Sequence, residues 1–339
     1  MREANVTFIF TPEDDLKRYL EKALADLKQV KFLYPADERE ETLIELCREA
    51  NIIIGWRASD KLIEKSEKLS LYIFPGAGAH SVVEIFRKLD RDPMPVLING
   101  HGNSYFTAQG TVGLLLALTN KIIPHHNWMI EGKWRTGDED AITIPLKNRH
   151  AGFLGYGAVN SKAHKFLAGF DLEFSALRRD WDKLSEPIPT ALTKYDDTEL
   201  HAFLERIDTL VIAVPVTSKT EGLIGEAQLK LLGKDSLLVN IARGKVVDEL
   251  SLYTALKNGT IAGAALDVWY DYKPEPDEQS RKYPYSHPFH ELDNVVMSPH
   301  RAASPFNDLE RWQEVIENIR RYAEGRDDFV NVVDLETGY

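Results

Sequence analysis

Hydrophobic and polar residues alternate with two different periods along the first hundred residues of the chain. Short runs rich in β-branched and aromatic residues predict strands, and the segments between them repeat apolar residues at the spacing of a helix face. Strands and helices that alternate in this way form a parallel sheet covered by helices. The predicted strands are NVTFIF (5–10), VKFLY (30–34), NIIIGW (51–56) and LSLYIF (69–74), and the predicted helices lie at 12–27, 36–50 and 59–68.

A second alternation begins near residue 149, after a long helical pattern from about Tyr105 to Trp128. Six strands with helices between them are typical of a Rossmann-type unit. The restart therefore predicts two α/β domains: a dinucleotide-binding domain at 102–301, and a substrate domain at 1–101 that the last segment, 302–339, would complete. The six predicted strands are RHAGFL (149–154), LEFSAL (172–177), TLVIAVP (209–215), SLLVNIA (236–242), IAGAALDV (261–268) and NVVMSPH (294–300).

The composition narrows the possible functions. The 339 residues carry a net charge of -12, which argues against a general nucleic-acid-binding protein because a polyanion would be repelled. No apolar run approaches the roughly 20 residues that span a bilayer, and the N-terminus lacks the apolar segment of a signal peptide. The single cysteine, Cys47, lies at helical spacing in TLIELCREA and is interpreted as a buried structural thiol. We expect a cytoplasmic protein that binds neither nucleic acid nor membrane and holds no metal ion.

Residues 152–160, GFLGYGAVN, are similar to the phosphate-binding turn of dinucleotide-binding proteins. Gly155 would permit the tight turn from strand to helix, and Gly157 would let backbone N–H groups approach a pyrophosphate. The third glycine of the usual pattern is Asn160 here, which would cost close helix–strand packing rather than the anion site. An ordinary glycine turn is the alternative, but the flanking strand and helix favour a nucleotide site. The predicted turn also includes Tyr156, Ala158 and Val159.

The type of cofactor depends on the residues after the second strand of this unit. An acidic residue there normally holds the ribose hydroxyls of NAD, whereas this chain has Arg178 and Arg179. A guanidinium can bind a 2′-phosphate through two hydrogen bonds, so the pair favours NADP. NAD stays possible, because Asp180 could reach the ribose and the two arginines could be a solvated pair.

Several longer segments resemble the D-isomer-specific 2-hydroxyacid dehydrogenase family. They are GAGAHSV (76–82), NGHGN (99–103), DTLVIAVPVTSKTEGLIG (208–225), LLVNIARGKVVDELSLYTALKNGTIAGAALDVW (237–269), LDNVVMSPHRAAS (292–304) and NVVDLETGY (331–339). The resemblance implies a doubly wound parallel-sheet nucleotide-binding domain, a smaller flavodoxin-like substrate domain and a homodimer. It also implies an oxidoreductase that transfers a hydride between NADP(H), or NAD(H), and a small 2-keto or 2-hydroxy acid of D configuration.

The same resemblance implies roles for individual residues. Arg243, in the ARG motif, would hold the substrate and polarise its C=O bond, and His300, in the SPH motif, would be the proton donor. Asp267 would orient the nicotinamide amide. The main-chain N–H groups of Ala77 and Gly78 would receive the substrate carboxylate. Further cofactor contacts are implied for Val214, Pro215, Thr220, Ile241 and Ala242, and for Arg243 and His300 themselves.

In the family a glutamate holds the catalytic imidazole, in a short Glu-Pro step soon after the LDV motif. Strict spacing after Asp267 leads to Tyr272, which has no fixed negative charge near pH 7. The loop that follows is long, and an insertion of a few residues before Glu275, which precedes a proline, would restore the match. We therefore predict Glu275 as the catalytic partner of His300. Asp271 is the alternative, and Tyr272 or water would be the partner if both acids are solvated.

Two other functions share these features. A dinucleotide-sensing regulatory or co-repressor protein could use the same fold, although the presence of both Arg243 and His300 favours an enzyme. A formate- or phosphite-type dehydrogenase would also use an arginine in its pocket.

Overall fold

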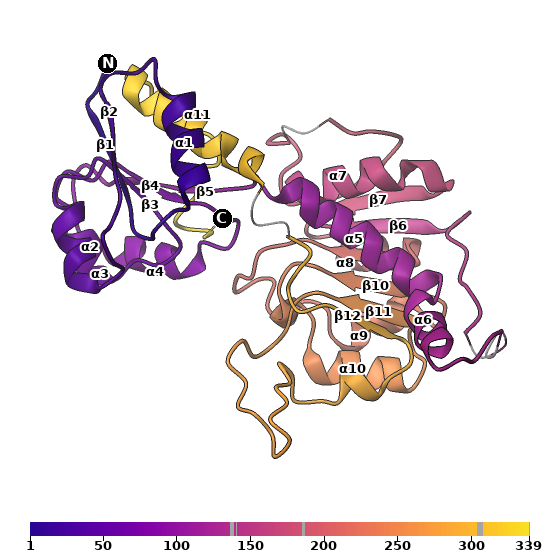
Figure 1. Cartoon of the computed structure of the whole chain (residues 1–339). Helices are drawn as coiled ribbons and strands as arrows, with labels where there is room; N and C mark the ends of the chain where they lie inside the picture. The colour runs from indigo at the N-terminus through magenta and orange to yellow at the C-terminus, as the bar shows by residue number, and fades with distance from the viewer. Residues whose placement is uncertain (136–138, 140, 185–186, 304–307, 339) are drawn as a thin grey trace. The chain divides into compact units, whose positions relative to one another are not determined.

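The computed structural model describes residues 1–135, 139, 141–184, 187–303 and 308–338, and the chain forms two compact units (Figure 1). The first unit comprises Met1–Asn103 with Pro305–Tyr339, and the second comprises Ser104–Ser304. Each unit is built around its own parallel sheet with helices on both faces. The predicted fold class of two Rossmann-like α/β domains is therefore confirmed.

The first unit contains a sheet of five parallel strands. They are β1 (Ala4–Phe8), β2 (Val30–Leu33), β3 (Ile52–Ile54), β4 (Leu71–Phe74) and β5 (Val96–Asn99). Their spatial order is β2-β1-β3-β4-β5, which is the order of flavodoxin-like folds. All residues of the central strands β3 and β4 are buried, which explains why their sequences are apolar without alternation.

Helices cover both faces of this first sheet. On one face, α1 (Asp14–Ala23) and α11 (Gln313–Glu324) pack against the strands, and they lie side by side in Figure 1. The other face is covered by α2 (Glu40–Cys47), α3 (Asp60–Lys65) and α4 (His80–Lys88). Burial among these helices raises the pKa of the Cys47 thiol to about 12. The thiol is therefore an inert packing group.

The second unit contains a sheet of seven parallel strands. They are β6 (His150–Leu154), β7 (Glu173–Leu177), β8 (Thr193–Tyr195), β9 (Thr209–Ile212), β10 (Leu237–Asn240), β11 (Gly263–Leu266) and β12 (Val295–Met297). Their spatial order is β12-β11-β10-β9-β6-β7-β8, which is the Rossmann order with one strand added after the sixth. The chain reverses its direction across the sheet between β6 and β9, and ligands of such sheets bind at the carboxyl ends of the strands beside that reversal.

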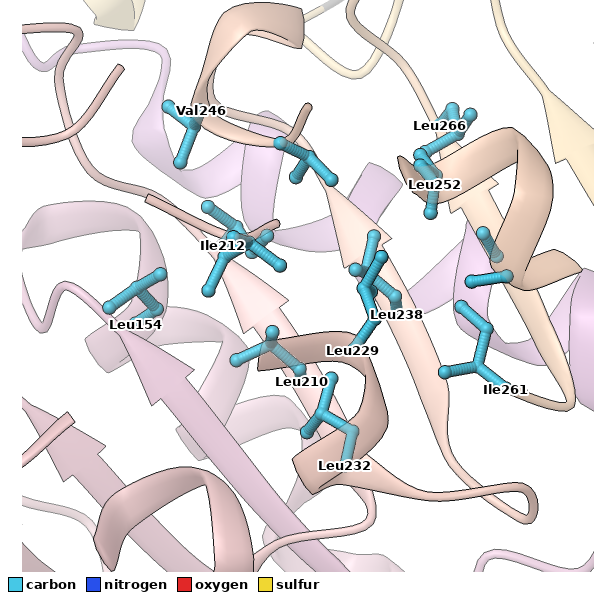
Figure 2. Packing of buried hydrophobic residues seen from close by; sticks show 14 of the residues in the cluster. Leu154, Leu210, Ile212, Leu229, Leu232, Leu238, Val246, Leu252, Ile261 and Leu266 are labelled. Atoms are coloured by element: carbon cyan, nitrogen blue, oxygen red, sulfur yellow. The ribbon is translucent and has the colours of Figure 1, made fainter. Parts of the chain in front are cut away.

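Two layers of helices enclose the second sheet. One face is covered by α5 (Ser104–Thr119) and α7 (Ala158–Leu167). The other face is covered by α8 (Leu200–Arg206), α9 (Glu226–Leu232) and α10 (Glu249–Lys257). Figure 2 shows the hydrophobic core between the sheet and the helices α8, α9 and α10. There, leucines of α9 and α10 pack against Leu210 and Ile212 of β9 and Leu238 of β10. The packing holds the carboxyl ends of these strands in fixed register.

The prediction of one long helix from Tyr105 to Trp128 is wrong, because this segment forms two helices. Helix α5 ends at Thr119, Lys121 adopts a left-handed φ of 51°, and α6 (Ile122–Ile130) follows. Pro124 explains the break, because in a continuous helix its ring would clash with the carbonyl group four residues earlier. The predicted strands also omit β5 and β8. Strand β8 is mostly exposed, so its sequence lacks the apolar run of a buried strand.

Candidate active site

The turn between β6 and α7 has the geometry of an anion-binding loop. Gly155 has a φ of +82°, and a Cβ there would lie 2.7 Å from Val214 Cγ1, so only glycine fits. A Cβ at Gly157 would meet no atom within 4 Å, which leaves space for a ligand to approach the backbone. Helix α7 begins at Ala158, and the N–H groups of Ala158 and Val159 have no acceptor among the described residues. Free N–H groups at a helix N-terminus fit the pyrophosphate of a dinucleotide.

Asn160 occupies the position of the usual third glycine and is completely buried. Its side-chain amide donates to the carbonyl oxygen of Gly155 at 2.6 Å and to that of Val211 at 3.5 Å. The amide thus ties the turn to its own first glycine and to the neighbouring strand β9. Its Oδ1 has no hydrogen-bond partner, so burying this side chain carries a cost that the donated bonds offset in part.

Tyr156 contributes only its backbone to this turn, because its side chain is buried in the core beneath it. Its hydroxyl forms a hydrogen bond with Nδ1 of His164 at 2.7 Å, and Nε2 of His164 bonds the hydroxyl of Thr190 at 2.8 Å. Burial lowers the pKa of His164 to about 4, so the imidazole is neutral at pH 7. This buried chain of hydrogen bonds fixes α7 relative to the turn.

Arg178 follows β7 and reaches back to the phosphate turn. Its guanidinium donates to the carbonyl oxygen of Tyr156 and to that of Asp180. The carboxylate of Asp180 accepts the backbone N–H groups of Asp182 and Lys183 at 3.0 and 3.3 Å, so it is already engaged in its own turn. Arg178 therefore lies beside the phosphate turn, and its contact with a 2′-phosphate stays a prediction. Arg179 beside it is exposed.

The loops after β9 and β10 carry the other expected cofactor contacts. Val214 and Pro215 are half-buried at the carboxyl end of β9, and Ile241 is buried after β10. The hydroxyl of Thr220 donates to the carbonyl oxygen of Pro215 at 2.6 Å and accepts the N–H group of Thr217 at 2.8 Å. In this structure Thr220 shapes its own loop, and its contact with a cofactor stays a prediction.

Arg243 is fixed at the carboxyl end of β10 by its neighbours. The amide of Asn240 accepts the N–H group of Ala242 at 3.1 Å and donates to the carbonyl oxygen of Arg243 at 3.0 Å. The guanidinium donates to the carbonyl oxygen of Ala242 at 2.6 Å. A Cβ at Gly244 would lie 2.4 Å from the carbonyl oxygen of Trp269, so this loop packs directly on the loop after β11. The backbone that carries Arg243 is therefore held on two sides.

Asp267 shapes the backbone that carries His300. His300 has a left-handed φ of 58°, which is uncommon for a non-glycine residue. The buried carboxylate of Asp267 accepts the hydroxyl of Ser298 at 2.5 Å and the N–H groups of Arg301 and Ala302 at 2.7 and 3.0 Å. These three bonds brace the turn on both sides of His300. The expected contact of Asp267 with a nicotinamide amide stays a prediction.

The hydroxyl of Tyr272, and not the carboxylate of Glu275, is hydrogen-bonded to the imidazole of His300. The distance from Tyr272 Oη to His300 Nδ1 is 2.9 Å. Glu275 and Asp271 are exposed, and no hydrogen bond joins either to His300 in the part of the chain that the structure describes. The structure thus places Tyr272 beside His300, and the role predicted for Glu275 has no contact in the described residues to support it.

The path of the loop explains this difference. The N–H groups of Tyr270 and Asp271 both donate to the carbonyl oxygen of Pro284, at 3.1 and 3.0 Å. The two ends of the long loop are therefore joined before Glu275 is reached, and the additional residues extend from that junction. Strict spacing after Asp267, which leads to Tyr272, gives the observed neighbour of His300.

Arg243 and Asp267 are the charged groups that act on His300. The pKa of His300 lies below its ordinary value, first because of burial and second because of the positive charge of Arg243, while Asp267 acts in the opposite direction. Partial burial raises the pKa of Tyr272, a residue that is 55% exposed, although Arg243 opposes this, so the phenol keeps its hydrogen at pH 7. Arg243, Tyr272 and His300 are therefore electrostatic neighbours at one edge of the sheet.

A second set of free N–H groups lies in the first unit, in the loop between β4 and α4. Gly100 donates to the carbonyl oxygen of Gly76 at 3.0 Å, and Asn99 donates to that of Ala77 at 3.3 Å. Ala77 and Gly78 are exposed, and their N–H groups have no acceptor among the described residues. Such a loop, which leads into a helix N-terminus, is suited to a carboxylate.

Comparison with known proteins identifies the family. Residues 112–302 match the family model described as D-isomer specific 2-hydroxyacid dehydrogenase, NAD binding domain, and the chain belongs to this family. The glyoxylate reductase of Thermofilum pendens is 36% identical over 61% of this chain and 58% of its own length. The D-3-phosphoglycerate dehydrogenase of Archaeoglobus fulgidus is 31% identical over 78% of this chain and 48% of its own length. The chain thus spans about half to three-fifths of these curated relatives.

Solved structures share the fold over the whole chain. The D-isomer specific 2-hydroxyacid dehydrogenase from Xanthobacter autotrophicus Py2, in complex with NADPH and MES, has a TM-score of 0.76 at 25% identity. The match covers 100% of this chain and 100% of that chain. The NADPH-dependent glyoxylate/hydroxypyruvate reductase from Sinorhizobium meliloti, in complex with NADP and sulfate, has a TM-score of 0.75 at 21% identity, over 99% of this chain and 100% of that chain.

The described residues provide neither a membrane-spanning helix nor a cluster of metal ligands. None of their helices has both the length and the apolar character required to cross a membrane. Nor do three or more His, Cys, Asp or Glu side chains among them come together as ligands for a metal ion.

Proposed function

We propose that this protein is a reductase of small 2-keto acids that uses NADPH and forms 2-hydroxy acids of D configuration. The observation that carries the proposal is that Arg243 and His300 follow β10 and β12 at the carboxyl edge of the sheet, near enough for the charge of Arg243 to lower the pKa of His300. A fixed cation acts there on an imidazole whose Nε2 has no partner among the described residues. This pair suits a substrate that carries a carbonyl group beside a carboxylate.

The residues of the phosphate turn support a dinucleotide cofactor. The free N–H groups of Ala158 and Val159, with the open approach to Gly157, would hold its pyrophosphate. When bound, the nicotinamide supplies the hydride that adds to C2 of the keto acid. Arg178 stands after β7 where an acid would bind the ribose of NAD, and its positive charge would attract a 2′-phosphate, which favours NADPH over NADH.

Arg243 and His300 would complete the reduction. The guanidinium of Arg243 binds the keto acid and stabilises the negative charge that develops on its carbonyl oxygen. Protonated His300 donates a proton from Nε2 to the same oxygen and becomes neutral imidazole. One hydride and one proton have then been added to the C=O bond, and the products are a 2-hydroxy acid and the oxidised cofactor.

Ala77 and Gly78 are proposed as main-chain donors to the substrate carboxylate. The family resemblance assigns them this role, and the exposure of both residues with free N–H groups supports it. Because these donors belong to the backbone, a side-chain substitution would alter their access rather than remove them. Gly78→Val should therefore raise the KM for keto acids severalfold and leave the Kd for NADPH unchanged.

We also propose that the second unit forms a homodimer through α6 and residues 131–135, which follow it. No residue of α6 is buried, and Ile123 and Ile130 are 42% and 72% exposed, while Trp134 is 74% exposed. An apolar surface of this kind is usually covered by a partner, and the family resemblance favours a second copy. Light scattering during size exclusion should show a dimer that Ile130→Glu converts to monomer. Leu250→Glu, at an exposed leucine of α10, is the matched control and should remain a dimer.

A cytoplasmic location is part of the same proposal. The single Cys47 is buried with a raised pKa, so the chain uses no disulfide that would suit an oxidising compartment. Localisation of the tagged full chain tests this point.

The proposed activity is tested by following NADPH absorbance with a panel of keto acids. Glyoxylate and hydroxypyruvate are the first choices, because the relatives in Thermofilum pendens and Sinorhizobium meliloti are named for reducing them. We expect turnover with at least one keto acid and a lower KM for NADPH than for NADH. Turnover with no member of the panel would refute the proposal, and a clear preference for NADH would refute its cofactor part.

A further inference from the structure

The partner of His300 is a phenol that is itself held in place. Tyr272 Oη lies 2.9 Å from His300 Nδ1 and accepts the backbone N–H group of Trp269 at 3.4 Å. The indole of the buried Trp269 donates to the carbonyl oxygen of Ser298 at 2.8 Å. The loop that carries Tyr272 is thereby joined to the loop that carries His300. These hydrogen bonds hold the side chains of Tyr272 and His300 next to each other, with their ring centroids 5.5 Å apart.

The hydrogens on the phenol and the imidazole determine which of the two side chains donates the hydrogen bond. A phenol has one hydrogen to donate and two lone pairs to accept with. One lone pair of Tyr272 faces the N–H group of Trp269, so the phenolic hydrogen is free to point at the imidazole. Neutral imidazole accepts at one nitrogen and donates at the other. If Nδ1 accepts from Tyr272, neutral His300 carries its hydrogen on Nε2.

We propose that Tyr272 is the positioning residue of His300: it donates its phenolic hydrogen to Nδ1, fixes the neutral imidazole with its hydrogen on Nε2, and gives the histidine an uncharged partner. The catalytic meaning of this arrangement rests on the proposed function, but the arrangement itself does not. When His300 is protonated, Nδ1 donates to the second lone pair of the same phenol, and Nε2 still carries the hydrogen that a substrate oxygen would receive.

An uncharged partner affects the pKa of His300 differently from a carboxylate. A carboxylate on Nδ1 would stabilise the imidazolium and raise the pKa of His300. Tyr272 adds no charge, so burial, Arg243 and Asp267 are the influences on the titration of His300, and the first two keep its pKa below the ordinary value. The protonated fraction, which reduction requires, therefore declines as pH rises through a value below about 6.5.

Nitrogen NMR of histidine-labelled protein without substrate or cofactor tests the proposal. The signal of His300 is assigned by its loss in His300→Gln. In the wild type, neutral His300 should show a protonated Nε2 and an unprotonated Nδ1. Tyr272→Phe keeps the ring and removes only the hydroxyl, and it should shift the tautomer ratio of His300 without lowering its pKa.

The chain offers a matched control in the same loop. Tyr285 Oη lies 3.1 Å from Nδ1 of His290, which is exposed. Tyr285→Phe removes the same type of hydrogen bond and should change the signals of His290 while leaving those of His300 in place. Glu275→Gln should leave the pKa of His300 unchanged.

Kinetics provide a second readout. Loss of one positioning hydrogen bond should lower kcat for keto-acid reduction by roughly tenfold in Tyr272→Phe, with KM nearly unchanged. A neutral wild-type His300 protonated on Nδ1, or a fall in its pKa in Glu275→Gln, would overturn the proposal. Because the NMR measurement needs no turnover, an inactive protein with the expected tautomer would refute the proposed function and leave this inference intact.

Discussion

The side-chain amide of Asn160 donates a hydrogen bond to the carbonyl oxygen of Gly155, 2.6 Å away. Asn160 thus stands where the usual pattern has its third glycine, and its side chain is hydrogen-bonded to Gly155, the first glycine. Glycine at this position would permit close packing of helix and strand but could not hold the turn. In this chain the turn is held by a hydrogen bond between side chain and backbone.

Replacing Asn160 by glycine should therefore weaken cofactor binding, although it restores the usual fingerprint. The Gly155 carbonyl loses its donor, and the Kd for NADPH should rise by roughly five- to tenfold, the effect expected for one hydrogen bond. Quenching of tryptophan fluorescence on NADPH addition measures this Kd. Asn258→Gly, at an exposed asparagine, is the control. Equal or tighter binding by Asn160→Gly would show that the amide does not organise the turn.

Arg178→Asp should reverse the preference between the two cofactors. The substitution removes the guanidinium proposed for the 2′-phosphate and adds a carboxylate that repels it, so the KM for NADPH should rise at least tenfold. The KM for NADH should fall or stay the same. Arg179→Asp changes the charge equally at the exposed neighbouring residue and should have a smaller effect. If the two variants behave alike, the preference comes from general charge and not from Arg178.

Asp267→Asn should lower the pKa of His300 further. The negative charge of Asp267 raises that pKa in the present structure, and the asparagine removes this contribution. Reduction needs protonated His300, so the decline of kcat/KM with rising pH should move to lower pH. A pH profile from about 4.5 to 8.5 shows the shift. Asp271→Asn, at an exposed aspartate, should leave the profile in place, and an unshifted profile in Asp267→Asn would argue against the assignment of this titration to His300.

His164 should make the folded protein less stable in acid. Its pKa of about 4 in the folded state lies below the ordinary value, so the unfolded chain binds the proton first. The contribution of neutral His164 is complete above about pH 6.5 and is lost as pH falls toward about 4, by up to about 3 kcal/mol in the free energy of unfolding. Urea unfolding at pH 7 and pH 4.5 should show a smaller pH effect in His164→Gln than in the wild type. The exposed His126→Gln is the control, and the same pH effect in all three proteins would contradict the assignment.

The sequence predicts the fold well where apolar runs are long and regular. Both sheets, the glycine turn and the ends of β10, β11 and β12 follow from such runs and their motifs, because fully buried parallel strands require continuous apolar residues. The division of α5 from α6 depends on Pro124, a single residue within an otherwise helical pattern. A periodicity analysis over a long apolar segment does not register such a single local break.

The candidate site shows a different limit. Motifs point to Arg243 and His300, but a motif does not describe how a loop of unusual length returns to the sheet. Strict spacing after Asp267 points to Tyr272. That the additional residues come after this position is shown only by the bonds of Tyr270 and Asp271 to Pro284, fourteen and thirteen residues away in sequence, and no local pattern encodes those bonds. Likewise, the hydrogen bond of Asn160 to Gly155 requires the geometry of the turn, and the sequence shows only the absence of a glycine.

The central claim is that a hydride passes from the cofactor to C2 of a keto acid while His300 supplies the proton. Reduction of hydroxypyruvate with NADPH that carries deuterium at both C4 positions of the nicotinamide tests it most directly, with the product analysed by mass spectrometry and chiral chromatography. The account predicts glycerate of D configuration that carries deuterium at C2. It also predicts a rate lower by roughly 10²–10⁴-fold in His300→Gln, whose affinity for NADPH should be retained. Product without deuterium, product of L configuration, or an unchanged rate in His300→Gln would contradict the account.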